Sequence, residues 1–283
     1  MITEFRKEFK SNKGPIFSLA VLPNGDLVTG YKFCTIEIRD ANLGTLKQTL
    51  TGHSSWINDL LVLGENRLIS ASDDGDINIW NISEAAVERT LSSHSKGITA
   101  LKLIKREDLV SCSKDKTIKI WNIHEGTVRR TLKGHEGEVC TLVVLNNGDL
   151  ASGALDSTIK IWNFDTGEVK KTLKGHTKCI NRLELLSNGD LVSGASDKTI
   201  KIWDAESGAV KRTLNGHTKH VYALKVLGNG DLVSAAGGEF LVWDVETGVV
   251  KKEVKVNSCI NSFLELGNGD LVAASNESII VWG

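Results

Sequence analysis

The stretch Ser111–Asn122 reads SCSKDKTIKIWN, and close copies of it recur along the chain at a nearly constant spacing. The Trp that ends each copy recurs at intervals of 41, 41, 41, 40 and 39 residues, at Trp80, Trp121, Trp162, Trp203, Trp243 and Trp282. Arg39 occupies the matching position one interval earlier. A series of histidines keeps the same 41-residue spacing, at His53, His94, His135, His176 and His217. A fixed period near forty residues predicts one small unit repeated many times.

Each repeat has the pattern of four short strands. In the repeat around Trp203, apolar-rich Ile180–Leu186 fits a buried strand, and Leu191–Gly194 fits a second one. Thr199–Trp203 is alternating and β-branched, and Val210–Leu214 follows as a fourth strand. The segments between them are polar turns, most with Gly. One such sheet cannot bury both of its faces, so successive repeats are expected to pack face to face in a ring.

A Gly-His pair followed after about 27 residues by Trp-Asp or Trp-Asn, with S-x-S-x-D-x-T-I-K-I-W before it, resembles the WD-repeat β-propeller family. The resemblance covers essentially the whole chain. It implies an all-β fold of seven four-stranded antiparallel blades in a single domain, residues 1–283, anchored at Arg39, Trp80, Trp121, Trp162, Trp203, Trp243 and Trp282. The last blade lacks a fourth strand after Trp282, while Phe5–Lys10 aligns with the fourth strand Val169–Lys174. Residues 4–10 are therefore expected to complete blade seven and close the ring, as in that family.

Four repeats carry a complete set of His, Ser, Asp and Trp. They are His53, Ser70, Asp74, Trp80; His94, Ser111, Asp115, Trp121; His135, Ser152, Asp156, Trp162; and His176, Ser193, Asp197, Trp203. His, Ser and Asp together are the residue types of a nucleophilic triad. Four equivalent copies, each with a Trp that has no catalytic task, favour a scaffold instead, and the resemblance implies a buried hydrogen-bond chain. One His per set also disfavours a metal site. No catalytic residue, cofactor or metal is expected.

The other three repeats depart from this pattern. Blade six has Gly237 in the place of the Asp, and blade seven has Ala273 and Asn276 in the Ser and Asp places. Blade one has Asn12, Thr29, Phe33 and Arg39 in the four places. Amide exchange is therefore expected to be fastest in blades six, seven and one.

The resemblance also implies which loops bind partners. In that family the loop before the first strand and the loop between the second and third strands surround the channel mouth. Trp56, the one Trp outside the repeated series, falls there with other aromatic residues of the kind that dominate binding energy. The candidate partner-binding residues are Phe17, Lys32, Trp56, Asn58, Asp73, Lys114, Leu155, Arg182, His220 and Tyr222. The alternative for Trp56 is an aromatic lid packed on its own loop. Asp59 and Arg182 are each expected to line the channel or to pair with another charge.

Composition narrows the class of protein further. The formal net charge is −1, so no overall field favours nucleic acid or an anionic membrane. No apolar run is long enough to cross a bilayer, and the first residues lack the apolar stretch of a secretory signal. Five irregularly spaced cysteines predict a reducing compartment, the cytoplasm or the nucleus. Basic pairs in the fourth strands are expected to protect sheet edges, with a basic belt for RNA or phosphoinositide as the alternative.

These observations together predict a rigid, monomeric interaction platform that binds a protein or peptide partner and has no enzymatic activity. One alternative is a regulatory or substrate-recruiting propeller domain of a larger protein, such as a ubiquitin ligase or a signalling NTPase. A third is a propeller enzyme with its site in the channel, which would need several His, Arg or acidic residues converging from different first strands.

Overall fold

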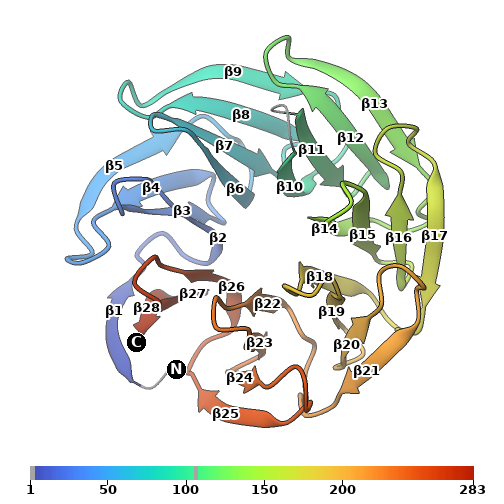
Figure 1. Ribbon diagram of the computed structural model, residues 1–283. Coiled ribbons are helices and arrows are strands. Elements are labelled where there is room, and N and C mark those ends of the chain that lie inside the picture. Colours follow the sequence, from blue (N-terminus) through green and yellow to red (C-terminus); the bar gives the residue numbers. More distant parts are fainter. Residues whose placement is uncertain (1–3, 105–107) are drawn as a thin grey trace. The chain divides into compact units, whose positions relative to one another are not determined.

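The computed structural model describes residues 4–104 and 108–283. In these residues the regular structure consists of 28 strands, arranged as seven four-stranded sheets (Figure 1). Neighbouring strands within each sheet run antiparallel. The fold is therefore an all-β, seven-bladed propeller, as the repeat predicts.

The strand bounds follow the repeat along the chain. Blade one contains β2 (Ile16–Val21), β3 (Leu27–Tyr31), β4 (Thr35–Arg39) and β5 (Leu46–Thr51), and blade two contains β6 (Ile57–Leu63), β7 (Arg67–Ser72), β8 (Asp76–Asn81) and β9 (Ala86–Ser92). Blade three contains β10 (Ile98–Ile104), β11 (Asp108–Ser113), β12 (Thr117–Asn122) and β13 (Thr127–Lys133), and blade four contains β14 (Val139–Val144), β15 (Leu150–Ala154), β16 (Thr158–Trp162) and β17 (Val169–Lys174). Blade five contains β18 (Ile180–Leu185), β19 (Leu191–Ala195), β20 (Ile200–Trp203) and β21 (Val210–Leu214). Blade six contains β22 (Ala223–Val226), β23 (Leu232–Ala236), β24 (Glu239–Trp243) and β25 (Val250–Lys255), and blade seven contains β26 (Ile260–Glu265), β27 (Leu271–Ser275), β28 (Ser278–Trp282) and β1 (Phe5–Lys10).

The chain divides into two compact units. The first comprises Met1–Asp115, Ile120–Arg129 and Asn261–Gly283, which hold blades seven, one and two and most of blade three. The second comprises Lys116–Lys119 and Arg130–Ile260, which hold blades four, five and six.

The N-terminal strand completes the last blade. β1 pairs antiparallel with β28, from Phe5 opposite Trp282 to Lys10 opposite Ser278. Beyond the strand ends, the backbones of Glu4 and Gly283 exchange two hydrogen bonds of 3.0 and 3.2 Å. Every residue of β28 is buried, so β1 covers an apolar strand that would otherwise expose one edge. The predicted closure by residues 4–10 is confirmed.

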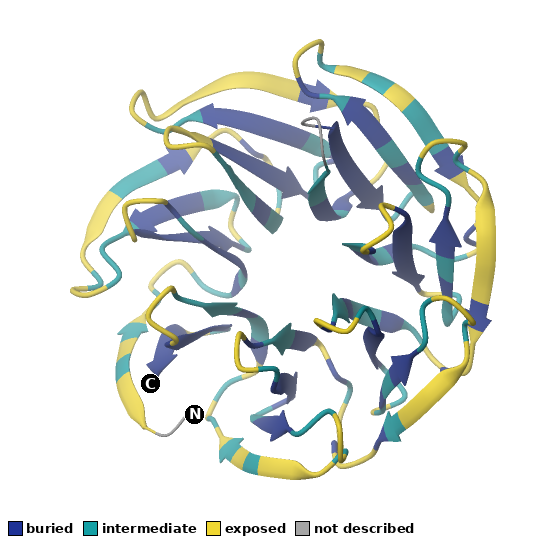
Figure 2. Ribbon diagram, in the orientation of Figure 1, coloured by how far each residue is buried: buried dark blue, intermediate teal, exposed yellow. Residues whose placement is uncertain are grey.

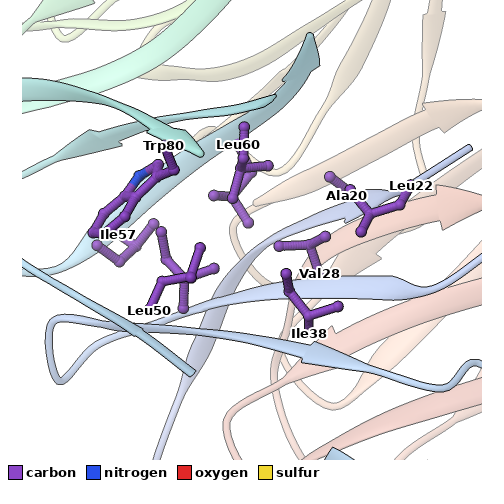
Figure 3. Close-up of a cluster of buried hydrophobic side chains, with 10 residues drawn as sticks. Ala20, Leu22, Val28, Ile38, Leu50, Ile57, Leu60 and Trp80 are labelled. Atoms are coloured by element: carbon purple, nitrogen blue, oxygen red, sulfur yellow. The ribbon is translucent and has the colours of Figure 1, made fainter. Parts of the chain in front are cut away.

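The position of each strand in its blade decides how far it is buried. The second strands are buried along their whole length in blades one, four, five, six and seven, whereas the fourth strands are mostly exposed (Figure 2). Within each unit the apolar core lies between successive sheets. In one cluster Val28 and Leu50 of blade one pack with Ile57, Leu60 and Trp80 of blade two (Figure 3).

The Gly of the Gly-His pair has a packing role in this core. A Cβ atom on Gly52 would lie 3.0 Å from the Trp80 ring and 3.1 Å from Val87, and one on Gly216 would lie 2.9 Å from the Trp243 ring. These distances are shorter than ordinary carbon contacts, so a β-carbon at Gly52 or Gly216 would displace the indole by a few tenths of an ångström. The Gly-His pair and the Trp are thus coupled by packing as well as by spacing.

Candidate functional site

The four His-Ser-Asp-Trp sets form four nearly identical hydrogen-bond chains. The Trp Nε1–Ser Oγ distance is 2.7–2.8 Å, the Ser Oγ–His Nε2 distance is 2.7 Å, and the His Nδ1–Asp Oδ2 distance is 2.7–3.0 Å. The indole N–H can only donate, so the serine oxygen accepts from it and gives its own proton to Nε2. The imidazole then donates its Nδ1–H to the carboxylate. One tautomer satisfies every group in the chain.

Burial and hydrogen bonding set the charges in these sets. Burial lowers the pKa of His135 and His176, and their Asp partners only partly offset it. Burial raises the pKa of Asp156 and Asp197, but hydrogen bonds that include those from the imidazoles outweigh it and bring both values to about 2. A neutral imidazole therefore lies beside an ionised carboxylate at neutral pH.

The serine hydroxyls in these sets cannot reach a substrate. Ser70, Ser111, Ser152 and Ser193 have no exposed surface, and each hydroxyl already donates to an imidazole and accepts from an indole. A nucleophile in acyl transfer must contact the reacting carbonyl. The geometry of the four sets therefore supports a role in holding each blade together.

Blade six builds the same chain with a different acid. Ser234 bonds to Trp243 Nε1 at 2.7 Å and to His217 Nε2 at 2.6 Å, and His217 Nδ1 lies 3.4 Å from Glu239 Oε1. The alignment that placed Gly237 in the Asp position missed Glu239. One residue is missing from this repeat, and the longer Glu side chain, two positions further on, spans the gap. The shortened interval from Trp203 to Trp243 was the available signal.

Blade one replaces the chain with an ion pair. Arg39, in the Trp position, contacts Glu37 through Nη2 at 2.7 Å, and the Tyr31 hydroxyl donates to the same Glu37 oxygen at 2.8 Å. Glu37 is only 1% exposed, so these two donors compensate the cost of burying its charge. Sequence reasoning identified Arg39 and Thr29 but missed Tyr31 and Glu37. In blade seven, Asn276 accepts from Asn261 at 2.9 Å.

The loop pairs implied by the resemblance are joined by backbone hydrogen bonds. In blades one, two and three, the first backbone amide after the second strand donates to the carbonyl of the residue before the first strand. These bonds are Lys32 N to Pro15 O at 2.8 Å, Asp73 N to Trp56 O at 2.8 Å, and Lys114 N to Gly97 O at 2.9 Å. Leu155 N with Glu138 O and Ser196 N with Cys179 O repeat the arrangement in blades four and five, each at 2.8 Å. The side chains of these hydrogen-bonded residues therefore occupy equivalent positions in the five blades.

Five of the candidate residues gather into a group, the Trp56 patch, in the first unit. The members are Phe17, Lys32, Trp56, Asp73 and Lys114. Trp56 stacks on Phe17 of the neighbouring blade, with ring centroids 5.4 Å apart and planes at 21°, and it remains 39% exposed. The ammonium groups of Lys32 and Lys114 lie 4.7 and 5.9 Å from the Trp56 ring centroid. An exposed aromatic pair is thus flanked by two cations.

The charges of the Trp56 patch do not balance. Lys114 Nζ lies 2.5 Å from Asp73 Oδ1, which neutralises one of the two cations. Among the described residues, no carboxylate lies within ion-pair distance of Lys32. The patch therefore combines apolar ring surface with one uncompensated positive charge.

Asn58 and Asp59 serve the scaffold next to this patch. Asn58 Nδ2 donates to the carbonyl of Ile98 in the next blade at 2.7 Å. Asp59 Oδ2 accepts from the backbone amide of Leu101 at 2.8 Å. The partner of Asp59 is therefore a neutral amide of the adjacent first strand, whereas its place in the channel stays a prediction.

The remaining candidates belong to the second unit. His220 and Tyr222 contact each other, with ring centroids 5.9 Å apart and a His Nδ1–Tyr hydroxyl distance of 3.2 Å. Tyr222 and Leu155 are exposed, and Arg182 is half-buried in β18, opposite Gly194 of β19. These residues form one aromatic pair and two separate side chains.

The basic pairs of the fourth strands are engaged within the protein. The first cation of each pair binds the buried Asp at the turn between the first and second strands, in Arg6–Asp270, Arg129–Asp108, Lys170–Asp149, Lys211–Asp190 and Lys251–Asp231, at 2.6–2.7 Å. The second cation reaches a backbone carbonyl of the next blade in several cases, as with Lys7 and Ala41, Arg130 and Asp165, and Arg212 and Thr247. This use of the cations gives no support to a basic belt for RNA or phosphoinositide.

In residues 4–104 and 108–283, no three His, Cys, Asp or Glu side chains come together in a way that could hold a metal ion. In the same residues no helix has the length and apolar character needed to cross a membrane.

Two family models match the chain. The model of the WDR41 β-propeller matches residues 125–283, more than half of the chain, and the model of the WD domain, G-beta repeat, matches residues 44–81 and 86–122. The two matches of the second model end at Asn81 and Asn122, the last residues of the third strands of blades two and three. Comparison with curated proteins finds no match. The blades, their hydrogen-bond chains and these matches show that the chain belongs to the WDR41 family of WD-repeat β-propellers.

Proposed function

We propose that this protein is a scaffold that binds a peptide segment of a protein partner through the Trp56 patch. WD-repeat propellers generally act as platforms for protein interactions, and the finer assignment to this patch is our inference. The observation that carries it is Trp56 itself, a large aromatic side chain stacked on Phe17 yet 39% exposed. The other Trp side chains in the described residues are at most 5% exposed.

The energetic argument starts from the aromatic pair. Trp side chains are enriched among the residues whose truncation costs about 2 kcal/mol or more of binding energy. The stack on Phe17 holds the Trp56 ring in place before binding, so little side-chain entropy remains to be lost. The cation of Lys32 near the ring adds a charged contact at the edge of the apolar surface.

Charge complementarity indicates the kind of segment that fits. Lys32 has no carboxylate partner among the described residues, whereas Lys114 is neutralised by Asp73. A segment with an apolar or aromatic side chain next to an Asp or Glu would cover the Trp56 ring and pair with Lys32 at the same time. We therefore propose an acidic-apolar peptide as the partner of this site.

The test selects binders from a phage-displayed library of random peptides with the full chain as bait. We expect the enriched peptides to combine an acidic residue with a large apolar one. For such a peptide, Trp56→Ala should weaken binding by about 2 kcal/mol, roughly thirty-fold. Unfolding stability should fall by no more than about 1 kcal/mol, the energy typical of one partly exposed aromatic pair.

Matched control variants distinguish binding at the Trp56 patch from nonspecific binding to the protein surface. Leu43 is 73% exposed in the same unit, and Leu43→Ala should leave peptide affinity unchanged. Lys32→Glu should weaken binding, while Lys13→Glu, at an exposed lysine of the same unit, should not. Equal binding by the wild-type and Trp56→Ala chains would overturn the proposal. Loss of several kcal/mol of stability in Trp56→Ala would place Trp56 in the core instead.

We also propose that the chain acts as a monomer in the cytoplasm or nucleus. The support for the compartment is compositional: the five cysteines are irregularly spaced and do not form the framework of a disulfide-rich secreted protein.

A further inference from the structure

Two cysteines from adjacent blades are in contact. The Sγ atom of Cys140, in β14, lies 3.6 Å from the Sγ atom of Cys179, the residue before β18. Both side chains are half-buried, and both belong to the second unit. They are 39 residues apart in the chain. Within residues 4–104 and 108–283, no other two cysteine sulfurs are in contact with each other.

The position of Cys140 is one that joins blades elsewhere in the protein. At the matching place, Asn58 donates to Ile98 O, Asn181 donates to Val221 O, and Asn261 donates to Ile16 O, at 2.7, 2.7 and 2.9 Å. Each of these amides reaches from the first strand of one blade to the start of the first strand in the next. In blade four the same place holds a thiol, and a second thiol faces it from blade five.

A hydrogen bond between β14 and β18 holds the two first strands together beside the thiols. The amide of Leu183 in β18 donates to Thr141 Oγ1 in β14 at 3.1 Å, one residue after Cys140. Disulfide sulfurs are about 2.05 Å apart, so the two sulfurs need to approach each other by only about 1.5 Å. Rotation of the two short side chains can supply that movement while the strands stay in place.

The surroundings favour a reactive thiol at Cys179. The hydrogen bond between Cys140 and Cys179 lowers the pKa of Cys179 by more than burial and the nearby carboxylates of Asp156 and Glu138 raise it. Cys112 provides the contrast within the same chain, because full burial raises its pKa to about 12. The thiolate is the form that attacks disulfides.

We propose that Cys140 and Cys179 form a dithiol site that a low-molecular-weight disulfide oxidises to a disulfide joining blades four and five. The Cys179 thiolate attacks one sulfur of the small disulfide, whose S–S bond breaks and releases one small thiol. The Cys140 thiol then loses its proton and attacks Cys179 sulfur in the mixed disulfide, which releases the second small thiol. Two protein thiols are oxidised and one small disulfide is reduced to two thiols, so electrons and protons balance.

The disulfide would restrict the loops that contain Leu155 and Ser196. Glu138 O, two residues before Cys140, accepts from Leu155 N, and Cys179 O accepts from Ser196 N. A covalent bond between β14 and the residue before β18 would restrict both loop pairs together. The site is independent of the Trp56 patch, which belongs to the first unit.

The test incubates the full chain with glutathione disulfide and then counts free thiols after unfolding. We expect two of the five thiols to be lost. Trypsin digestion without reduction should yield residues 134–160 joined to residues 179–182, and reduction should separate them. Cys140→Ser and Cys179→Ser should each prevent the link. Cys140→Ser keeps the attacking thiol and should accumulate one bound glutathione at Cys179, whereas Cys179→Ser should accumulate much less at Cys140. Cys34→Ser and Cys259→Ser should leave the link intact.

Three outcomes would overturn the proposal. The first is bound glutathione on wild-type protein without any joined peptide. The second is a link that involves another cysteine. The third is loss of thiols that proceeds equally in Cys140→Ser and wild-type chains, because an unassisted Cys179 would then account for the reaction.

Discussion

Removal of one buried hydroxyl tests the scaffold most sharply, and Ser152→Ala in blade four is the best place for it. Ser152 has no exposed surface, and its oxygen lies 2.8 Å from Trp162 Nε1 and 2.7 Å from His135 Nε2. The substitution leaves a buried N–H donor and a buried nitrogen acceptor without their partner. Each unsatisfied group costs about 1–3 kcal/mol, so we expect the two together to lower the unfolding free energy by about 2–6 kcal/mol.

Urea unfolding followed by Trp fluorescence measures this loss. Ser93→Ala removes an exposed hydroxyl and should change stability by less than about 0.5 kcal/mol. In a Trp162→Phe background the indole N–H is absent, so Ser152→Ala should cost less there than in the wild-type background. An equal cost in both backgrounds, or a loss as small as that of Ser93→Ala, would refute the hydrogen-bond chain as a source of stability.

Four further expectations follow from the fold. Deletion of residues 1–10 should lower the melting temperature of the whole chain, because β28 loses its partner strand; unchanged cooperative melting would contradict the closure. Asp156→Asn should destabilise more than Glu239→Gln, since the His–acid distance is 2.8 Å in blade four and 3.4 Å in blade six, and urea midpoints of the two variants decide it. Stability should fall as the pH drops from 7 to 5, because burial lowers the pKa values of His135, His176 and His217 in the folded protein. The unfolded chain therefore binds more protons below about pH 6.5, and a melting temperature that does not change between pH 7 and 5 would argue against this. Amide exchange should be fastest in blades six, seven and one, where the hydrogen-bond chains depart from the pattern, and uniform protection would count against that expectation.

The period of the Trp series was enough to predict the number of blades and the register of their strands. The third strand ends at the Trp in blades four to seven, one residue after it in blades two and three, and at Arg39 in blade one. In blades two to six the indole donates to the serine of the second strand, which fixes the place of the Trp in the blade. The alignment of Phe5–Lys10 with Val169–Lys174 predicted the closing strand, which starts at Phe5 as expected. These features recur in each repeat, so the prediction for one repeat can be compared with the sequence of the next.

Features that depend on side-chain reach were missed. Glu239 replaces the Asp of blade six through a longer side chain after a one-residue deletion, which a position-by-position alignment does not detect. In blade one, and in no other of the described blades, Glu37 pairs with an Arg in the Trp position and also accepts a hydrogen bond from Tyr31. The ion pairs between turn aspartates and fourth-strand cations had a usable signal, a separation of 21 residues in blades three to five, but the pattern was taken only as edge protection.

The stack of Phe17 on Trp56 lay beyond sequence reasoning for a different reason. Phe17 lies in β2 and Trp56 in the loop before β6 of the next blade, and the contact of their rings depends on the rotamers of both side chains. The positions could be predicted from the resemblance, but the pairing of rings and the uneven charges of Lys32, Asp73 and Lys114 required coordinates.

The seven indole N–H signals of the chain provide the most direct test of the central claim, that a rigid scaffold presents one exposed Trp to a partner. Indole N–H resonances of ¹⁵N-Trp-labelled protein would be recorded in D₂O and then during titration with a peptide selected by the intact chain. The account predicts that the Trp56 signal exchanges quickly and shifts on titration, while the five indoles that donate to serine stay protected and do not shift. A peptide that shifts a serine-bonded indole and leaves Trp56 unmoved would contradict it.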